Sequence, residues 1–187
     1  MNTVKEIETS AKQRMDKALE DLQHAMATIR TGRASVHLLD NVRVDYYGTP
    51  TPVSQVANLH APEPGMITIT PWDTSQIGPI EKALRIAELG LNPSNDGKMI
   101  RIPIPPLTEE RRREYVKLVR GKAEEARVAI RNVRRDEVHR IDQMQKQGEV
   151  AEDDAKRGTA RLQKITESQI ERVDALAGRK EAEVMEV

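Results

Sequence analysis

The residues with the clearest chemical capacity in this sequence are arginines that recur every seven positions. Arg113, Arg120, Arg127 and Arg134 follow one another at this interval, and Arg131 lies four residues after Arg127. On a helix that turns by 100° per residue, all five lie within an arc of roughly 60°. Guanidinium groups form paired hydrogen bonds with phosphate oxygens, so this arginine stripe could bind the backbone of a nucleic acid.

The first part of the stripe has acidic partners on the same predicted helix. Glu109 lies four residues before Arg113, and Glu124 lies four residues after Arg120. Ion pairs at this spacing stabilise a helix by only ~0.2–0.5 kcal/mol and are common on solvated surfaces. We therefore interpret Arg113 and Arg120 as ordinary surface residues.

The far end of the stripe lacks such partners. Arg131 has no carboxylate three or four residues away in either direction, and three of those four positions hold Arg127, Arg134 and Arg135. Like charges at these spacings destabilise a helix, and an anion from elsewhere would offset that cost. The stripe also borders an apolar seam, however, where charges often pair with a neighbouring helix. Two interpretations therefore stay open: phosphate binding, or ion pairs with acidic residues of a third helix.

The positive charge of the chain is local. The sequence has 30 Lys and Arg residues against 30 Asp and Glu residues, so its formal net charge is zero. Residues 108–147 nevertheless carry 12 basic and 8 acidic side chains, and an anionic partner is expected to bind there. With three tyrosines, one tryptophan and no phenylalanine, the chain has few platforms for stacking on bases. We therefore favour recognition of the phosphates and shape of folded RNA.

No arrangement of residues in the sequence indicates catalysis or a metal site. The stretch from Gly90 to Lys98 has six residues between its glycines and no Ser or Thr after its lysine, unlike a P-loop. There is no cysteine, and the histidines lack the spacing of metal ligands. We predict a binding protein that is not an enzyme, with no catalytic residues, metal or cofactor. The histidines are His24, His37, His60 and His139.

The distribution of proline divides the chain into three parts. All ten prolines lie within residues 50–106, and the segments on either side repeat apolar residues at helical spacing. These seams predict one helix that ends near Arg30–Gly32 and a second that runs from an N-cap at Thr108 to Gly148. A third helix is expected to begin at the acidic residues 152–154. None of these helices can bury its seam alone, so together they predict a three-helix bundle.

The proline-rich middle segment shows the alternation of apolar and polar residues that is typical of strands. Residues 42–46, 67–70 and 100–104 alternate in this way. A short helix is expected between the last two, with Pro79 near its start and Gly90 as its C-cap. The segment therefore predicts a small β/α/β domain.

We accordingly predict an α+β fold in two domains. Residues 1–30 and 108–187 form an elongated three-helix bundle that binds RNA, and residues 31–107 form the inserted β/α/β domain. The two are joined only at Thr31–Ser35 and Ile104–Leu107. Such a two-stranded hinge would permit relative motion of the domains.

Nothing in the sequence predicts a membrane location. No stretch approaches the roughly 18 consecutive apolar residues that a membrane span needs. The first residues, MNTVKEIETSAKQ, lack the apolar core of a secretory signal. The absence of cysteine fits a reducing compartment. The protein is expected to be a soluble, cytoplasmic monomer.

Four segments of the sequence resemble the bacterial ribosome recycling factor family. They are IRTGRAS at 29–35, YYGTPTP at 46–52, ELGLNP at 88–93 and PPLTEERRREYVKLVRGKAEEARVAIRNVRRDE at 105–137. The similarity runs essentially end to end in the same order, and the last segment is highly specific. One departure lies at Ala151, where the family often places a Ser before the acidic turn. Alanine weakens that helix cap without affecting function.

The resemblance implies an architecture and an activity. Members of the family combine a three-helix bundle with a hinged β/α/β domain in an L shape close to that of tRNA. They bind the large (50S) ribosomal subunit after termination. With elongation factor G, which hydrolyses GTP, they split the ribosome into subunits and release it from mRNA. The inserted domain would be the part that moves and faces this GTPase.

The resemblance also implies contact residues. Family contacts to the ribosomal RNA of the large subunit correspond to arginines of the matched segment 105–137, and two further arginines match basic positions at the hinge. The predicted RNA-binding residues are Arg131, Arg134, Arg135, Arg127, Arg112, Arg30 and Arg33. The predicted hinge residues are Thr31, Gly32, Ile104, Pro105 and Pro106.

Two other functions stay open from the sequence. A structural helical adaptor would use its arginines only to stabilise its own bundle. A ribosome-associated RNA chaperone would bind RNA without recycling activity. Salt separates the adaptor from an RNA binder, because binding that neutralises phosphates weakens steeply as ionic strength rises.

Overall fold

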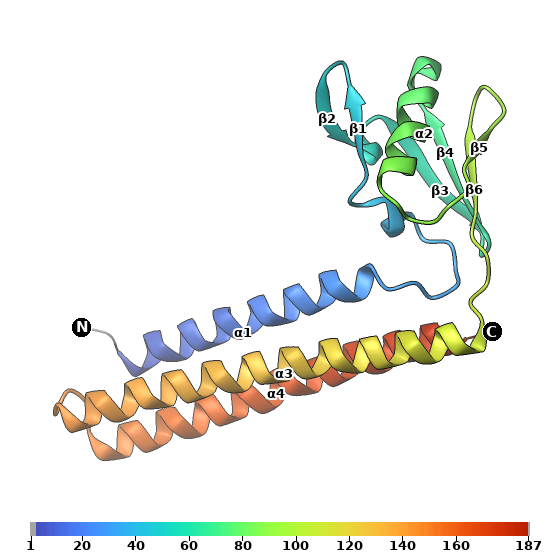
Figure 1. Cartoon of the computed structure of the whole chain (residues 1–187). Coiled ribbons are helices and arrows are strands. Elements are labelled where there is room, and N and C mark those ends of the chain that lie inside the picture. The colour runs from blue at the N-terminus through green and yellow to red at the C-terminus, as the bar shows by residue number, and fades with distance from the viewer. Residues whose placement is uncertain (1–2, 187) are drawn as a thin grey trace. The chain divides into compact units, whose positions relative to one another are not determined.

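The computed structural model describes residues 3–186, which divide into two compact units. Of these, residues 3–29 and 113–186 form the helical unit, and Arg30–Arg112, which include the first turn of α3, form the inserted unit. The helical unit is a bundle of three helices, and the inserted unit contains both strands and helix (Figure 1). The chain therefore has an α+β fold, and the contacts within each unit assign Arg30 and residues 108–112 to the inserted unit.

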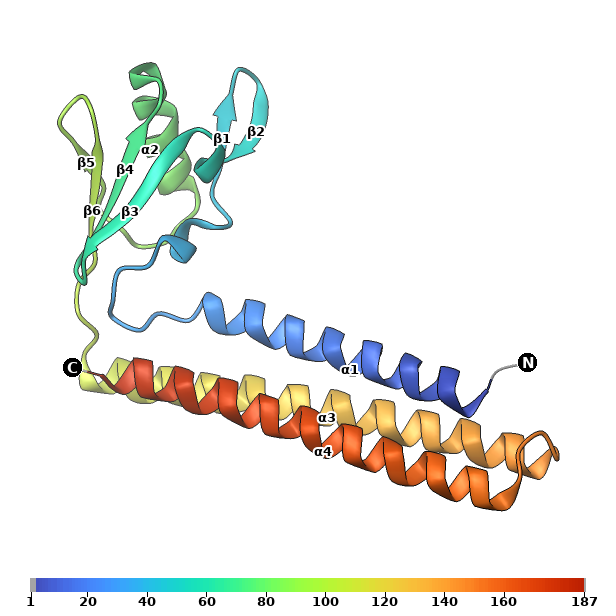
Figure 2. The same cartoon turned by 180° about the vertical axis from the view of Figure 1, so that it is seen from behind.

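The helical unit consists of α1 (Val4–Ala27), α3 (Glu109–Lys146) and α4 (Glu152–Met185). Helix α3 runs antiparallel to α1 and α4, as both views show (Figures 1 and 2). The apolar seams predicted for the three helices are buried against one another, which confirms the three-helix bundle. The largest fully buried side chains of this core are Ile7, Met15, Leu19, Ile130, Ile141 and Leu162.

The ends of α3 follow the predicted capping residues. The Thr108 hydroxyl accepts a hydrogen bond from the Arg111 N–H at 3.2 Å, as expected of an N-cap. At the other end, Gly148 has a φ of +75° and its N–H donates to Gln145, while the Glu149 N–H donates to Met144. These two bonds form a Schellman motif, which ends the helix.

Helix α1 ends earlier than predicted, at Ala27 and not at Arg30–Gly32. The hydroxyl of the C-cap residue Thr28 donates to the Ala25 carbonyl at 2.8 Å. Threonine side chains compete in this way with the regular backbone ladder. The helix begins with a capping box that the apolar seam did not reveal, in which Thr3 and Glu6 satisfy one another's backbone N–H groups.

Glu137 interrupts the seam of α3 and is nevertheless buried, with 1% of its side chain exposed. Its carboxylate accepts hydrogen bonds from Arg14 of α1 at 2.9 Å and from Arg140 of α3 at 2.7 Å. A buried carboxylate is tolerated when cations and hydrogen bonds satisfy it. Glu137 is therefore an ionic link between α1 and α3.

The inserted unit contains a hairpin and a four-stranded sheet, all of whose pairings are antiparallel. The order in the sheet is β3-β4-β6-β5. Helix α2 covers one face of the sheet, and the hairpin β1–β2 lies beside it (Figure 2). The strands are β1 (Arg43–Tyr46), β2 (Thr49–Pro52), β3 (Ala57–Glu63), β4 (Met66–Pro71), β5 (Ser94–Asn95) and β6 (Ile100–Pro103), and the helix is α2 (Ile77–Ile86). Short 3-10 turns occupy Val36–Leu39, Val53–Gln55 and Thr74–Gln76.

The core of the inserted unit lies between the sheet and α2. Ile67 and Ile69 of β4, Ile100 and Ile102 of β6 and Ile80 of α2 are each 0% exposed. The strands predicted from alternation correspond to β1, β4 and β6. Strands β2 and β3 contain prolines and β5 has two residues, so the alternation pattern did not reveal them. Prolines are tolerated because the strands lie at edges.

The prediction for the end of α2 was wrong in one respect. Pro79 is the third residue of the helix, as expected, but Gly90 is not its C-cap. The cap is Ala87, and Glu88 takes the left-handed conformation with a φ of +50°. Within residues 3–186, no helix combines the length and the apolar character needed to cross a membrane.

Candidate nucleic-acid interface

The arginine stripe lies on α3 along its border with α4. The seam residues Val119, Ala123, Ile130 and Val133 face the bundle core and are buried. The stripe flanks this seam, so its side chains reach both toward α4 and toward solvent. The contacts of each arginine decide which of the two interpretations of the stripe holds at that position.

Arg120 is held by α4, not by its own helix. Its Nε lies 2.9 Å from Oε1 of Glu181, and this carboxylate raises the pKa of Arg120. The predicted partner Glu124 instead contacts Arg127 and Arg131. Arg120 thus pairs across the bundle with α4, and the predicted pair with Glu124 of its own helix was wrong.

Arg127 is the most firmly held arginine of the stripe. Its Nη2 lies 2.7 Å from Oδ1 of Asp174 on α4, and its Nη1 lies 3.1 Å from Glu124. Only 24% of the side chain is exposed, and the hydrogen bonds to Asp174 are the main cause of its raised pKa. For Arg127 the geometry therefore favours an ion pair with the third helix over a site for phosphate.

The next three arginines of α3 have weaker partners or none. Arg131 reaches Glu124 at 3.4 Å, a carboxylate that it shares with Arg127, and 47% of its side chain is exposed. Arg134 donates to the neutral amide oxygen of Gln163 at 2.9 Å. Arg135 is exposed, and no hydrogen bond or ion pair joins it to any other residue of 3–186. We call Arg131, Arg134 and Arg135 the α3 cation cluster.

The prediction for Arg131 needs one correction. It has no carboxylate at three or four residues, but its long side chain reaches Glu124 seven residues back. Exposed pairs of this kind contribute about 0–1 kcal/mol. A phosphate that forms a bidentate hydrogen bond could replace this contact at little cost. The cation cluster can therefore bind a polyanion, and nothing in it provides acid–base or nucleophilic chemistry.

Three of the predicted RNA-binding residues, Arg30, Arg33 and Arg112, belong to the inserted unit, whereas Arg127 and the cation cluster belong to the helical unit. Arg30 is half-buried and donates a hydrogen bond to the backbone carbonyl of Leu89. Arg33 and Arg112 also interact with other residues of the chain. Arg30 therefore positions the segment after α2, a role that the sequence did not reveal.

The predicted hinge residues include a tightly packed glycine. Gly32 has a φ of +77°, and a Cβ at this position would lie 3.1 Å from the backbone nitrogen of Leu107. Only glycine adopts this conformation and this approach without strain. Ile104, Pro105 and Pro106 line a small cavity of about 110 Å³ with the same glycine. The two connecting segments thus lie against each other inside the inserted unit.

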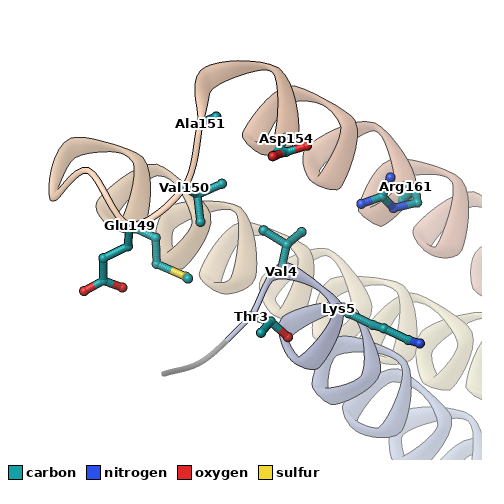
Figure 3. A pocket seen from close by; sticks show the side chains of 9 residues that line it. Thr3, Val4, Lys5, Glu149, Val150, Ala151, Asp154 and Arg161 are labelled. Atoms are coloured by element: carbon teal, nitrogen blue, oxygen red, sulfur yellow. The ribbon is translucent and has the colours of Figure 1, made fainter.

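A larger cavity of about 400 Å³ opens where α1 begins and α3 joins α4 (Figure 3). Val4, Met144 and Val150 supply its apolar lining. Arg161 also lines this cavity, but its Nε is held by Glu8 at 2.6 Å. The charge of Arg161 is thus compensated within the bundle, and the other cation in the lining, Lys5, accompanies the carboxylates of Glu149 and Asp154. Within residues 3–186, no group of three or more His, Asp or Glu side chains is placed to hold a metal ion.

Comparison with known proteins decides the family. The family model described as ribosome recycling factor matches residues 22–185 of the chain. The chain belongs to the ribosome recycling factor family. The ribosome-recycling factor of Rubrobacter xylanophilus is 55% identical over 179 residues, which cover 96% of each chain. That of Myxococcus xanthus is 54% identical over 176 residues, which cover 94% of this chain and 95% of its own.

Solved structures of ribosome recycling factors agree with the fold. A solution structure of the ribosome recycling factor has a TM-score of 0.85 and 41% sequence identity, with 100% of both chains covered. A second is a model of the Thermus thermophilus ribosome recycling factor, described together with Escherichia coli elongation factor G bound to the E. coli post-termination complex. It has a TM-score of 0.70 and 45% identity, and covers 99% of this chain and 100% of its own.

The departure noted at Ala151 has a structural counterpart. Ala151 is the N-cap of α4, with a φ of −67° and a ψ of +150°, and it makes no side-chain capping bond. The acidic first turn, Glu152, Asp153 and Asp154, interacts favourably with the helix dipole but leaves this cap unfilled. The residue lies on the rim of the cavity in Figure 3, in the helical unit, well separated in sequence from the α3 cation cluster.

Proposed function

We propose that the chain binds the large ribosomal subunit of post-termination complexes and, with elongation factor G, splits the ribosome into subunits and releases it from mRNA. Membership of the ribosome recycling factor family supports this function. So does the similar protein from T. thermophilus, described with elongation factor G and the post-termination complex. GTP would be hydrolysed by the elongation factor, and this chain would act in the cytoplasm by binding alone.

The α3 cation cluster is the observation that carries this proposal. Arg131, Arg134 and Arg135 lie within five residues of α3; Arg131 and Arg135 are exposed, Arg134 is half-buried, and within residues 3–186 the three share one weak ion pair. Their mutual repulsion destabilises the isolated protein, and ribosomal RNA phosphates would relieve it. The chain has few aromatic rings that could stack on bases, whereas guanidinium groups suit phosphates. Both favour contact with the RNA backbone over recognition of its bases.

The remaining predicted contacts receive different roles. Arg127 stabilises the bundle through its ion pair with Asp174. It would contribute to RNA binding mainly through its positive electrostatic potential, without direct contact. Arg112, Arg30 and Arg33 would add basic groups on the inserted unit.

The hinge is proposed to let the inserted unit move during splitting. Thr31, Gly32, Ile104, Pro105 and Pro106 lie in the two segments of the inserted unit that lead to the bundle helices, one after α1 and one before α3. Gly32 packs against Leu107 in a conformation that other residues rarely adopt. Gly32→Val should therefore impair splitting more than it impairs binding to the large subunit.

A subunit-splitting assay tests this function. Post-termination ribosomes, elongation factor G and GTP are mixed with the chain, and light scattering follows dissociation, while sedimentation with large subunits measures binding separately. The proposal predicts splitting only when both factors are present. Salt-insensitive or absent binding would support the structural adaptor instead. Binding without splitting would support the RNA chaperone.

A further inference from the structure

Three of the few aromatic side chains of this protein lie exposed at one end of the inserted unit. Tyr46 is 38%, Tyr47 76% and Trp72 64% exposed. The rings of Tyr46 and Tyr47 meet edge to face with centroids 4.7 Å apart. The Tyr47 hydroxyl lies 3.5 Å from Oδ2 of Asp73, the residue directly after Trp72. We call Tyr46, Tyr47, Trp72 and Asp73 the aromatic tip.

The backbone of Tyr47 argues that its ring has a use beyond folding. Tyr47 and Gly48 form the two-residue turn between β1 and β2, with φ values of +49° and +84°. Such a turn strongly prefers asparagine, aspartate or glycine at both positions, because bulky residues are strained at positive φ. The ring is also mostly solvated, so it gains little from burial in the free protein. A residue that is unfavourable for the turn and for solvation is typical of a binding surface.

The charge at the tip indicates the kind of partner. The Asp73 carboxylate accepts the backbone N–H of Ser75 at 3.0 Å, and this bond, with that of the Tyr47 hydroxyl, holds the pKa of Asp73 below its usual value. No ion pair joins Asp73 to a cation within residues 3–186. A fixed, ionised carboxylate beside the exposed side chain of Tyr47 repels the phosphates of RNA and attracts a cation. Aromatic faces also attract guanidinium and ammonium groups.

The basic residues nearest in the fold, Arg43 and Lys82, do not change the negative character of the aromatic tip. Arg43 and Lys82 line a cavity of about 460 Å³ between β1 and α2, together with Asp45. The carboxylate of Asp45 in turn accepts the Gly48 N–H at 2.8 Å. Arg43 and Lys82 thus share a cavity with Asp45, which is outside the aromatic tip, and the one carboxylate of the tip itself is Asp73.

We propose that the aromatic tip is a second interaction surface, which binds a protein segment that presents an arginine or lysine side chain to Tyr47, Trp72 and Asp73. The surface lies on the inserted unit and is chemically opposite to the α3 cation cluster, which suits RNA. The protein therefore carries separate surfaces for nucleic acid and for a basic protein partner. Exposed tyrosine and tryptophan are the residues most often found at the centre of protein interfaces.

A titration of the full chain with a short arginine-rich peptide tests the chemistry without any ribosome. Trp72 is the sole tryptophan of the chain, so its fluorescence reports on the tip. We expect a saturable change for the peptide and none for a glutamate-rich peptide of equal length. Asp73→Asn should lower the affinity for the peptide by about two- to fivefold, as expected when a single exposed contact with a cation is lost. An equal response of the wild type and Asp73→Asn would overturn the proposal.

The decisive variant is Tyr47→Asn, since asparagine fits the turn better than tyrosine. It should leave thermal stability unchanged or raised, and should keep binding to the large subunit, because the α3 cation cluster is intact. It should lower the affinity for the arginine-rich peptide by about two- to fivefold, because it removes the aromatic ring of Tyr47. A stable Tyr47→Asn variant that binds the peptide as tightly as the wild type would contradict the inference.

Photocross-linking identifies the class of the natural partner. Tyr47→p-benzoylphenylalanine is placed in post-termination complexes with elongation factor G, in samples that sedimentation shows to retain the chain. The cross-linking experiment rests on the proposed function, whereas the peptide titration does not. A failure of the proposed function can therefore be distinguished from a failure of this inference. We expect an adduct that survives ribonuclease and is removed by protease, and that Asp73→Lys abolishes. The same group at exposed Val128 serves as control. A ribonuclease-sensitive adduct at position 47, or none, would overturn the proposal.

Discussion

Arg127 Nη2 lies 2.7 Å from Asp174 Oδ1, which joins α3 to α4 by an ion pair. One heptad later on the same border, Arg134 donates to the neutral side-chain oxygen of Gln163, and no carboxylate within residues 3–186 pairs with it. The stripe therefore changes character along its length. Its first part is neutralised by the bundle, and its last part leaves positive charge for an external anion.

This change predicts that two single substitutions will differ in their effect on stability. Arg127→Gln should lower the free energy of unfolding by about 1 kcal/mol, because it breaks the partly buried pair with Asp174. Arg135→Gln should leave stability within about 0.5 kcal/mol, since it removes no contact among the described residues. Urea denaturation measures both. Equal destabilisation by the two variants would show that the stripe is structural throughout.

Two glycines of α4 form a matched pair for packing. A Cβ on Gly158 would lie 2.5 Å from Val4 Cγ1 and 3.3 Å from Ile141 Cδ1, whereas a Cβ on Gly178 would meet nothing within 4 Å. Gly158→Ala should destabilise the bundle by about 1–3 kcal/mol through overpacking. Gly178→Ala should stabilise it by up to about 1 kcal/mol through helix propensity.

Val4 provides the control for the glycine prediction. If the clash with Val4 is the cause, Val4→Ala should destabilise less in the Gly158→Ala background than in the wild type, which thermal unfolding of the four proteins would reveal. Additive effects of the two substitutions would indicate that the close approach of α1 and α4 is not what requires glycine.

The unfilled cap of α4 predicts a stabilising substitution. Ala151→Ser should raise the free energy of unfolding by about 1 kcal/mol, because the backbone at this position already has the extended conformation of an N-cap. Binding to the large subunit should not change. Chemical denaturation that gives the same midpoint for both proteins would show that the first turn of α4 is satisfied in another way.

The turn before β6 predicts a pH dependence. Asp96 accepts the backbone N–H groups of Met99 and Lys98 and a hydrogen bond from Arg101, and these lower its pKa from 3.8 to about 2. A carboxyl with a depressed folded pKa contributes stability that is complete above its unfolded pKa. This contribution should be lost as the pH falls from about 4 to about 2. An NMR titration that gives an ordinary pKa for Asp96 would contradict the geometry.

The sequence allowed the three bundle helices and the strands β1, β4 and β6 to be predicted because each shows a periodic apolar face, whereas α2 was expected from Pro79 and Gly90. It did not reveal β2 or β3, because edge strands with prolines carry no clear alternation. It also misassigned the partner of Arg120, since Glu124 fits the local spacing whereas Glu181 is 61 residues away. Long-range pairs of this kind depend on how helices pack, which periodicity alone does not specify.

In the candidate site, too, local spacing could be read from the sequence, whereas contacts between helices could not. Local charge spacing already separated Arg131 from Arg113 and Arg120, because repulsion within one helix can be counted from the sequence. The ion pair between Arg127 and Asp174 joins two helices and is not visible in local spacing. The sequence analysis therefore placed Arg127 among the RNA-binding residues. The aromatic tip was missed for a related reason. Tyr47 and Trp72 are 25 positions apart, and only the turn at Gly48 brings the first beside Asp73.

The salt dependence of large-subunit binding tests the central claim most directly. The triple variant with Arg131, Arg134 and Arg135 changed to Gln is compared with a control in which Lys17, Lys156 and Arg157, each in an exposed ion pair, are changed to Gln. Both variants lose three positive charges. If the α3 cation cluster binds phosphates, the slope of log K against log salt should fall by about 2–3 in the first variant and stay near the wild-type value in the control. An unchanged slope in the cluster variant, or an equal fall in both, would contradict the account.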